Sequence, residues 1–280
     1  MAAMGKRLSV AQALRAHWPE YLMEAWGLGT FMVSAGVFAA LLEYPGSPVH
    51  QAIPNGDLRL VLMGLAMGLT AIAIIYSPWG KQSGAHINPA VTLTFLRLGK
   101  INPIDAGFYI LAQFICGTAG IILVWAVLGS AFSEPPVVFI NTKPGDAGVA
   151  VAYFTEAAMA GGLMLVVLTA LSWEKLTPHV GYFAGIMVAG YIAFFAPLSG
   201  MSINPARTFA SAAPSGELSY LWLYFTAPVF GMLAAAELFR VAKLGRNWFC
   251  AKLIHDSRYR CIHCGYEPGK AARGQHEINR

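Results

Sequence analysis

Charged side chains are scarce in this sequence of 280 residues. Only 12% of the residues are Asp, Glu, Lys or Arg, whereas 56% are hydrophobic. A soluble domain of this size carries about 25% charged residues. The shortage excludes an ordinary water-soluble globular protein and indicates a chain that passes much of its length through a membrane.

The sequence also lacks the residue groupings that catalysis or nucleic-acid binding requires. We find no nucleophile–base pair, no phosphate-cradling glycine loop in a suitable context and no basic-aromatic binding motif. The first twenty residues contain no compact apolar core and no small-residue cleavage site, so we do not expect a removable signal peptide. These absences argue against an enzyme and against a nucleic-acid partner, despite the net charge of +5.

Six apolar runs are long enough to cross a bilayer. They lie near residues 20–42, 58–77, 105–128, 150–171, 180–197 and 219–242. If successive runs cross the membrane in opposite directions, both termini lie on the same side. Only Arg59, Lys143 and Arg207 then lie on the other side, and the remaining 16 of the 19 Lys and Arg lie on the side of the termini. The positive-inside rule then predicts a multi-pass protein of the cell membrane (inner or plasma) with both termini cytoplasmic.

Ten residues in the first half of the chain recur in the second half. Ser83–Thr92 and Ser199–Thr208 are identical at seven of their ten positions. Each half contains three predicted spans, so the second copy enters the membrane in the opposite direction, as in the inverted repeats of transport proteins. The repeats cover about 20–128 and 150–242, which predicts that the two ten-residue segments approach each other from opposite faces.

We therefore divide the chain into three parts. A cytoplasmic N-terminal segment is expected over 1–19, one membrane domain over 20–242 and a cytoplasmic basic tail over 243–280. The lipid bilayer is the expected environment of the middle part.

Each repeated segment ends in an Asn-Pro pair followed by an apolar run too short to span a bilayer. Asn is a good N-cap and Pro suits the first helical position. Asn88 and Asn204 are therefore predicted to begin half-helices. Non-helical backbone before each Asn is tolerated at membrane depth only if it is buried in protein or lines a watery cavity, so two such segments meeting head to head predict a pore.

At these residues the sequence resembles the aquaporin, or major intrinsic protein, family over about residues 20–242. The resemblance rests on two Asn-Pro-Ala motifs, the Arg after the second motif and a Glu early in the first and fourth spans. These residues are Asn88, Pro89, Ala90, Asn204, Pro205, Ala206, Arg207, Glu24 and Glu156. The resemblance implies an all-α fold of six transmembrane helices and two re-entrant half-helices, with an hourglass pore in each protomer. It also implies a homotetramer and no required cofactor.

The resemblance also implies roles for these residues. Half-helix N-termini present about half a positive charge each, and the amides of Asn88 and Asn204 would donate to passing water, which breaks a proton wire and repels cations. A charge such as Arg207 costs a few kcal/mol at membrane depth unless it faces a cavity or a partner, so we expect it at the constriction. Glu24 and Glu156 are expected to support the pore loops, and His86 lies beside the first motif.

Four positions are expected to form the selectivity filter by analogy with the family: Met67, Ile192, Met201 and Arg207. Met67 requires one extra residue within 77–82, and without it the position is Gly68. Strict water channels usually carry an aromatic residue and a His where this sequence has Met67 and Ile192. The expected filter is therefore wider and more apolar than theirs.

Other family positions give mixed indications of the solute. Thr208 and Ala212 replace the acidic and basic residues typical of glycerol facilitators, and Tyr224 occupies an aromatic position seen in the water-selective branch. We predict passive conduction of water, with leakage of small neutral solutes. The alternative is a facilitator of glycerol or another small neutral solute with little water selectivity, and an ion-coupled secondary transporter is less favoured.

Cysteine is rare and unevenly placed. Cys116 lies within the third span, whereas the other three cysteines lie in the tail together with a histidine: Cys250, His255, Cys261 and Cys264. Cys and His are the ligands of tetrahedral zinc sites, and the last two cysteines have the C-x2-C spacing of a zinc knuckle. The tail is therefore a candidate zinc site, and the alternative is a set of free thiols on a mobile basic tail.

Overall fold

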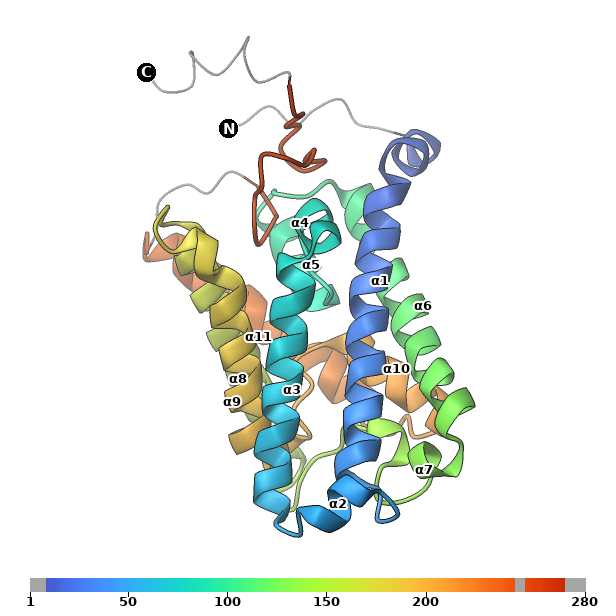
Figure 1. Cartoon of the computed structure of the whole chain (residues 1–280). Helices are drawn as coiled ribbons and strands as arrows, with labels where there is room; N and C mark the ends of the chain where they lie inside the picture. Colours follow the sequence, from blue (N-terminus) through green and yellow to red (C-terminus); the bar gives the residue numbers. More distant parts are fainter. Residues whose placement is uncertain (1–8, 245–249, 270–280) are drawn as a thin grey trace.

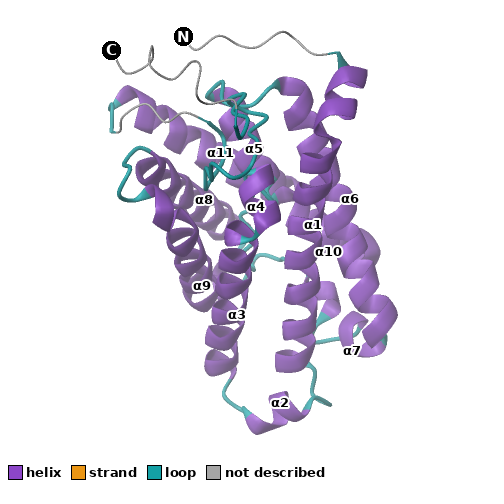
Figure 2. Ribbon diagram, turned by 45° about the horizontal axis from the view of Figure 1, so that its top comes forward, coloured by secondary structure: helices purple, strands orange, loops and turns teal. Residues whose placement is uncertain are grey.

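A computed structural model of the chain describes residues 9–244 and 250–269. Within these ranges the regular structure is helical and contains no strand (Figures 1 and 2). Six helices are long and apolar enough to cross a membrane, which confirms the six predicted spans. They are α1 (Val10–Glu43), α3 (Gly56–Tyr76), α6 (Pro103–Leu128), α8 (Val149–Leu171), α9 (Val180–Ser199) and α11 (Leu221–Val241).

The first helix begins earlier than the apolar run that predicted it. The Ser9 hydroxyl accepts a hydrogen bond from the backbone N–H of Gln12, and the backbone N–H of Ser9 donates to the Gln12 Oε1. This capping box fixes the helix start at Val10. Much of the expected N-terminal segment 1–19 is therefore the first part of α1, while residues 1–8 lie outside the described residues.

Short helices connect the spans on both sides of the bundle (Figure 1). We call the side on which α1 begins and α11 ends the tail side, and the opposite side the loop side. The loop side carries α2 (Pro48–Ala52), α7 (Ser130–Ser133) and the 3-10 helix η1 (Val138–Ile140), and the tail side carries α4 (Pro78–Ser83) and the 3-10 helix η2 (Thr177–His179).

Two half-helices, α5 (Pro89–Arg97) and α10 (Pro205–Ser215), follow the Asn-Pro pairs. The Asn88 side chain accepts a hydrogen bond from the backbone N–H of Ala90 at 2.8 Å, and Asn204 accepts one from Ala206 at 3.0 Å. Proline occupies the first helical position in both. The predicted starts of both half-helices are confirmed.

The long helices pack in a pattern that repeats between the two halves. Helix α1 packs along α6 in the first half, α8 packs along α11 in the second, and α3 and α9 cross between the halves. At that crossing a Cβ added to Gly68 would lie 2.5 Å from the Gly185 carbonyl oxygen. Small residues allow this close approach of two backbones, as at many membrane helix interfaces.

Residues 250–269 pack against the tail side of the bundle beside α4 (Figures 1 and 2). The backbone N–H of Leu253 donates to the carbonyl of Gly84 at 3.1 Å. Ala251, Lys252 and Cys261 are buried, with at most 2% of each residue exposed. This part of the predicted tail is thus folded onto the membrane domain, in contrast to a freely mobile tail.

Candidate functional site: a pore at the junction of the two half-helices

A cavity of 370 Å³ passes through the bundle between the two halves. Its lining extends from Glu43 and Leu60 on the loop side, past both pore loops, to Leu253 on the tail side. Most lining side chains are apolar, and the polar ones are Glu43, His86, Asn88, Asn141, Ser202, Asn204 and Arg207. An apolar wall with a few convergent polar groups is typical of a site for small solutes.

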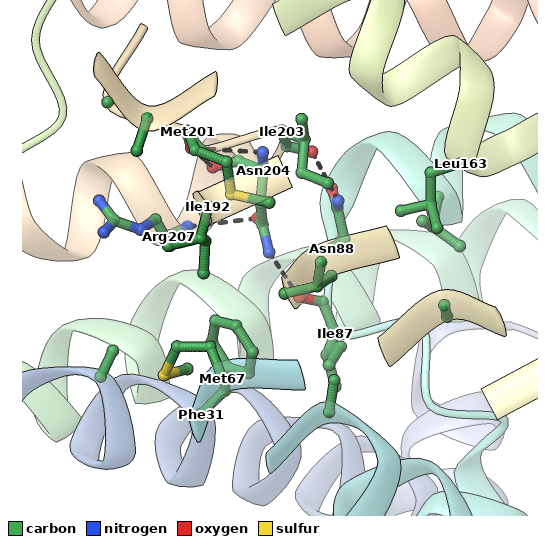
Figure 3. A pocket seen from close by; sticks show the side chains of 18 of the residues that line it. Phe31, Met67, Ile87, Asn88, Leu163, Ile192, Met201, Ile203, Asn204 and Arg207 are labelled. Atoms are coloured by element: carbon green, nitrogen blue, oxygen red, sulfur yellow. Dashed lines mark hydrogen bonds between the residues drawn. The ribbon is translucent and has the colours of Figure 1, made fainter. Parts of the chain in front are cut away.

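The two asparagines of the Asn-Pro-Ala motifs meet at the middle of this cavity (Figure 3). The Nδ2 of Asn88 donates to the carbonyl oxygen of Ile203 at 2.8 Å, and the Nδ2 of Asn204 donates to that of Ile87 at 2.8 Å. Each loop therefore supplies one donor and one acceptor to the other, and the centre of the pore is cross-linked by two hydrogen bonds.

These contacts fix which way each asparagine amide points. The Oδ1 of Asn88 and of Asn204 is occupied by backbone N–H groups of its own half-helix. An amide nitrogen has two N–H bonds, so the second N–H of each Asn remains after the cross-link to the other loop. A solute at this point meets donors from the asparagines rather than acceptors.

The two pore loops have the same unusual backbone. Ala85 and Ile87 in the first loop have φ of 53° and 42°, and Met201 and Ile203 in the second have φ of 45° and 48°. Non-glycine residues seldom adopt positive φ. The shared conformation shows that the sequence repeat is also a structural repeat.

Two buried glutamates hold these loops in place. The carboxylate of Glu156 accepts hydrogen bonds from Ser199 Oγ at 2.7 Å and from the backbone N–H groups of Ser202 at 2.9 Å and Ile203 at 2.6 Å. Glu24 plays the matching part in the first half. It accepts from the backbone N–H of Ile87 and from the Nε2 of Gln113, the latter at 2.8 Å.

Two tyrosines support the same loops, and sequence analysis named only Tyr224, for a different reason. The hydroxyl of Tyr109 donates to the carbonyl of Ser83 at 2.7 Å, and that of Tyr224 donates to the carbonyl of Ser199 at 2.6 Å. Both side chains are fully buried. Tyr224 thus supports the start of the second pore loop, and Tyr109 of α6 is its counterpart in the first repeat.

The four residues expected to form the filter all line the cavity: Met67, Ile192, Met201 and Arg207. Figure 3 shows them to one side of the paired asparagines. Gly68, the alternative to Met67, is not among the lining residues and instead packs against Gly185 of α9. The geometry therefore brings Met67 to the pore.

The guanidinium of Arg207 is held by a loop that sequence analysis did not connect to the pore. Its Nη1 donates to the carbonyl oxygen of Ile140 at 2.9 Å. Ile140 ends η1 and also lines the cavity. One nitrogen of the side chain is thus fixed to protein, which orients the remaining donors of this charged group.

Thr208, the residue after Arg207, is hydrogen-bonded within the protein. The Oγ1 of Thr208 lies 2.5 Å from Ser202 Oγ and 3.0 Å from Thr142 Oγ1. Thr208 and Ala212 are both buried, and neither lines the cavity. Thr208 therefore ties the second pore loop to the segment after η1.

At the other end, the first pore loop is joined to the tail through His86. Its Nδ1 lies 3.1 Å from Thr92 Oγ1 and its Nε2 lies 2.7 Å from the carbonyl oxygen of Ala251. The ring is buried and also lines the cavity. His86 therefore connects the cavity wall to residues far along the chain.

The tail brings its candidate metal ligands together. One ligand atom from each of Cys250, His255, Cys261 and Cys264 lies within 4.8 Å of the others. Hydrogen bonding with Cys250 and Cys261 holds the pKa of the Cys264 thiol well below its usual value. Hydrogen bonding with Cys261 and Cys264 raises the pKa of His255 to about 9. The cluster therefore favours a thiolate at Cys264.

Comparison with known proteins identifies the family. The sequence profile described as "Major intrinsic protein" matches residues 12–239. The chain belongs to the major intrinsic protein family. It is 31% identical to aquaporin TIP4-3 of Zea mays over 232 residues, covering 81% of this chain and 89% of the relative. It is 32% identical to aquaporin NIP1-4 of Oryza sativa subsp. japonica over 218 residues, covering 76% of this chain and 73% of the relative.

A solved structure shares the fold of this major intrinsic protein. The aquaglyceroporin from Plasmodium falciparum aligns with a TM-score of 0.69 at 21% identity, over 80% of this chain and 96% of that one. Members of the family are channels, and the chain is accordingly a multi-pass membrane channel and not an enzyme.

Proposed function

We propose that this protein is a passive channel for water that also admits small neutral solutes and excludes ions and protons. The observation that carries the proposal is the pair of crossed asparagines at the head-to-head N-termini of α5 and α10. Two positive helix ends repel cations. Donors that face the solute orient water so that it only accepts, which interrupts proton transfer along a water chain.

The composition of the proposed filter supports permeation by solutes larger than water. Met67, Ile192 and Met201 contribute apolar side chains, and Arg207 supplies the charged donor. A strict water filter needs bulk and further hydrogen-bonding side chains to reject an alcohol. This filter therefore favours a second candidate, a facilitator of glycerol or a similar neutral solute with little water selectivity.

Stopped-flow light scattering on proteoliposomes separates these candidates. An osmotic gradient of an impermeant sugar should cause fast shrinkage, and a glycerol gradient should cause shrinkage followed by re-swelling. Fast shrinkage without re-swelling would establish a water-selective channel. Re-swelling without fast water flux would overturn the proposal in favour of the facilitator.

A filter variant makes the assay specific to the proposed residues. Ile192→His introduces a hydrogen-bonding ring of the kind that strict water channels carry, so it should slow glycerol re-swelling while water flux is retained. Unchanged glycerol flux would remove Ile192 from the filter. Flux of either solute that depends on a proton or sodium gradient would instead support a secondary transporter.

We also propose the topology and assembly of the channel. Both ends of the chain are assigned to the cytoplasm because 16 of the 19 Lys and Arg lie on their side. A homotetramer with a separate pore in each protomer follows from the family resemblance. Labelling of a cysteine introduced at the exposed Ser257 by an impermeant reagent tests the first point, with reaction expected in inside-out vesicles and none in intact cells. Native mass spectrometry of the purified protein tests the second.

A further inference from the structure

The tail residues 250–269 hold four metal-ligand side chains in one compact group, outside the pore machinery. Zinc binds sulfur at about 2.3 Å and nitrogen at about 2.0 Å, which separates the ligand atoms of a tetrahedral site by about 3.5 Å. The Nε2 of His255 lies 3.3 Å from Cys264 Sγ, and all four ligand atoms lie within 4.8 Å of one another. The group needs only a small adjustment to enclose an ion.

Backbone hydrogen bonds close a tight turn around the C-x2-C segment. The N–H of Gly265, directly after this segment, donates to the Cys261 carbonyl at 2.9 Å, and the N–H of Cys261 donates to the Tyr266 carbonyl at 2.8 Å. The N–H of Lys252 donates to Cys250 Sγ at 3.5 Å. A backbone N–H that donates to sulfur stabilises a thiolate ligand. One chain supplies all four ligands.

The charge of such a site is balanced by a buried lysine. Three thiolates, one neutral imidazole and a divalent cation carry a net charge of −1. Lys252 is 1% exposed, and its Nζ donates to the carbonyl of Arg260 at 2.7 Å. A buried cation without a compensating charge is costly, and a metal–thiolate group beside Lys252 would supply that charge.

The same tail segment reaches the pore. Leu253 is 6% exposed and lines the tail-side end of the cavity. Its backbone N–H is bonded to Gly84, and the carbonyl of the nearby Ala251 is bonded to His86. The ring of His263, which lies between two of the metal ligands, stacks on His86 with the ring centroids 5.9 Å apart. The folded tail therefore covers the mouth of the first pore loop.

An ion pair anchors this cover to the first helix. Arg260 donates to the carboxylate of Glu20 through Nε at 2.7 Å and through Nη2 at 2.6 Å. The Glu20 side chain is fully buried. The segment between the metal ligands is thus tied to α1, to α4 through Lys81 and Asp256, and to the first pore loop.

We propose that Cys250, His255, Cys261 and Cys264 bind one Zn²⁺ ion, and that the metal-bound tail holds Leu253 across the tail-side mouth and lowers the permeability of the pore. The metal-binding part stands on the ligand geometry alone, and the closure rests on the proposed channel function. Loss of the metal removes the cross-link of the tail and frees the mouth.

Metal content tests the site independently of transport. The purified full-length protein should contain a single zinc ion per chain, and Co²⁺ substitution should give the thiolate charge-transfer and tetrahedral d–d absorption bands. Cys261→Ser with Cys264→Ser should lose both. Cys116→Ser, the matched control in α6, should keep both. A wild-type protein that takes up neither zinc nor cobalt would overturn the site.

Water flux then tests the closure. Chelator-treated wild type should shrink several-fold faster than the zinc-loaded protein, and added zinc should restore the slow rate in wild type but not in the double Ser variant. Leu253→Ala should keep its zinc and still conduct faster, which separates closure from misfolding. Equal water flux in all of these samples would overturn the closure. Absent flux in every sample, including Leu253→Ala, would overturn the proposed function and leave the zinc measurement to decide the site.

Discussion

The two pore loops have the same backbone conformation but differ in the residues that surround them. In the second loop, Arg207 follows the Asn-Pro-Ala motif and is held by the carbonyl of Ile140. In the first loop the same position is Val91, and the mouth is covered by the tail through His86 and Ala251. The repeat therefore builds the same loop and half-helix twice. The two ends differ in the residue after each motif, Val91 or Arg207, and in the tail segment that packs on the first loop alone.

The largest expected effect tests how differently the two loops depend on their glutamates. Glu156→Ala leaves three donors without their acceptor, which should cost on the order of 3 kcal/mol or more of stability because each unsatisfied buried donor costs about 1–3 kcal/mol. Glu24→Ala should cost less, because Gln113 also reaches Thr92 at 3.3 Å. Thermal unfolding in detergent, followed by tryptophan fluorescence, measures the difference. Equal losses would contradict the asymmetry.

The next prediction makes the second loop resemble the first. Arg207→Val removes the charge and the bond to Ile140, and should raise glycerol permeability by roughly tenfold, since a hydrogen bond to a charged group contributes about 1.5–3 kcal/mol. Proton leak should also rise, because a cation barrier is lost. Stopped-flow swelling and a pH-sensitive dye inside the vesicles record the two effects. Val91→Ala, the control in the first loop, should change neither.

A smaller effect is expected from releasing the cover of the first loop. Arg260→Ala leaves the buried carboxylate of Glu20 without its charged partner, and because the Arg260 side chain is 40% exposed the discounted loss is about 1–2 kcal/mol. Amide exchange of residues 250–262 should accelerate accordingly. Arg258→Ala is the matched control. Its side chain is 69% exposed and pairs with Asp256 within the tail, so it should leave this exchange nearly unchanged.

The smallest predicted difference concerns the crossed asparagines. Asn88→Ala and Asn204→Ala each remove one cross-link between the loops. Asn204 also accepts a second backbone hydrogen bond, from Arg207 at 3.2 Å, so its loss should destabilise the protein by about 1 kcal/mol more. Thermal unfolding of the two variants under identical conditions measures this gap. A larger loss for Asn88→Ala would contradict this prediction.

Much of the fold could be predicted because its signals are local. Apolar runs gave the six spans, and each Asn-Pro pair marked the start of a half-helix. The start of α1 was missed because residues 10–19 are too polar to extend an apolar run, although Ser9 and Gln12 form a readable cap. Hydropathy predicts which residues cross the membrane. The start of a helix that extends beyond the bilayer is indicated by its capping residues.

Other contacts of the site cannot be predicted from a local sequence pattern. Ile140 contacts Arg207 through a backbone carbonyl, which any residue type could provide. The Arg260–Glu20 pair joins positions 240 residues apart, and no periodicity connects them. The tyrosines were within reach, because Tyr109 follows Ser83 by 26 positions and Tyr224 follows Ser199 by 25. Extending the repeat comparison into the third and sixth spans would have paired them.

The crossed asparagine bonds have a consequence for how the channel is made. The acceptor for Asn88 is the carbonyl of Ile203, and that carbonyl is synthesised long after the first three spans. A half-length chain therefore holds its first loop with an amide and the Ile87 carbonyl still lacking their partners across the pore. The two cross-links between the loops can therefore form only after the second half has been inserted, which makes the joining of the two halves a late step of folding.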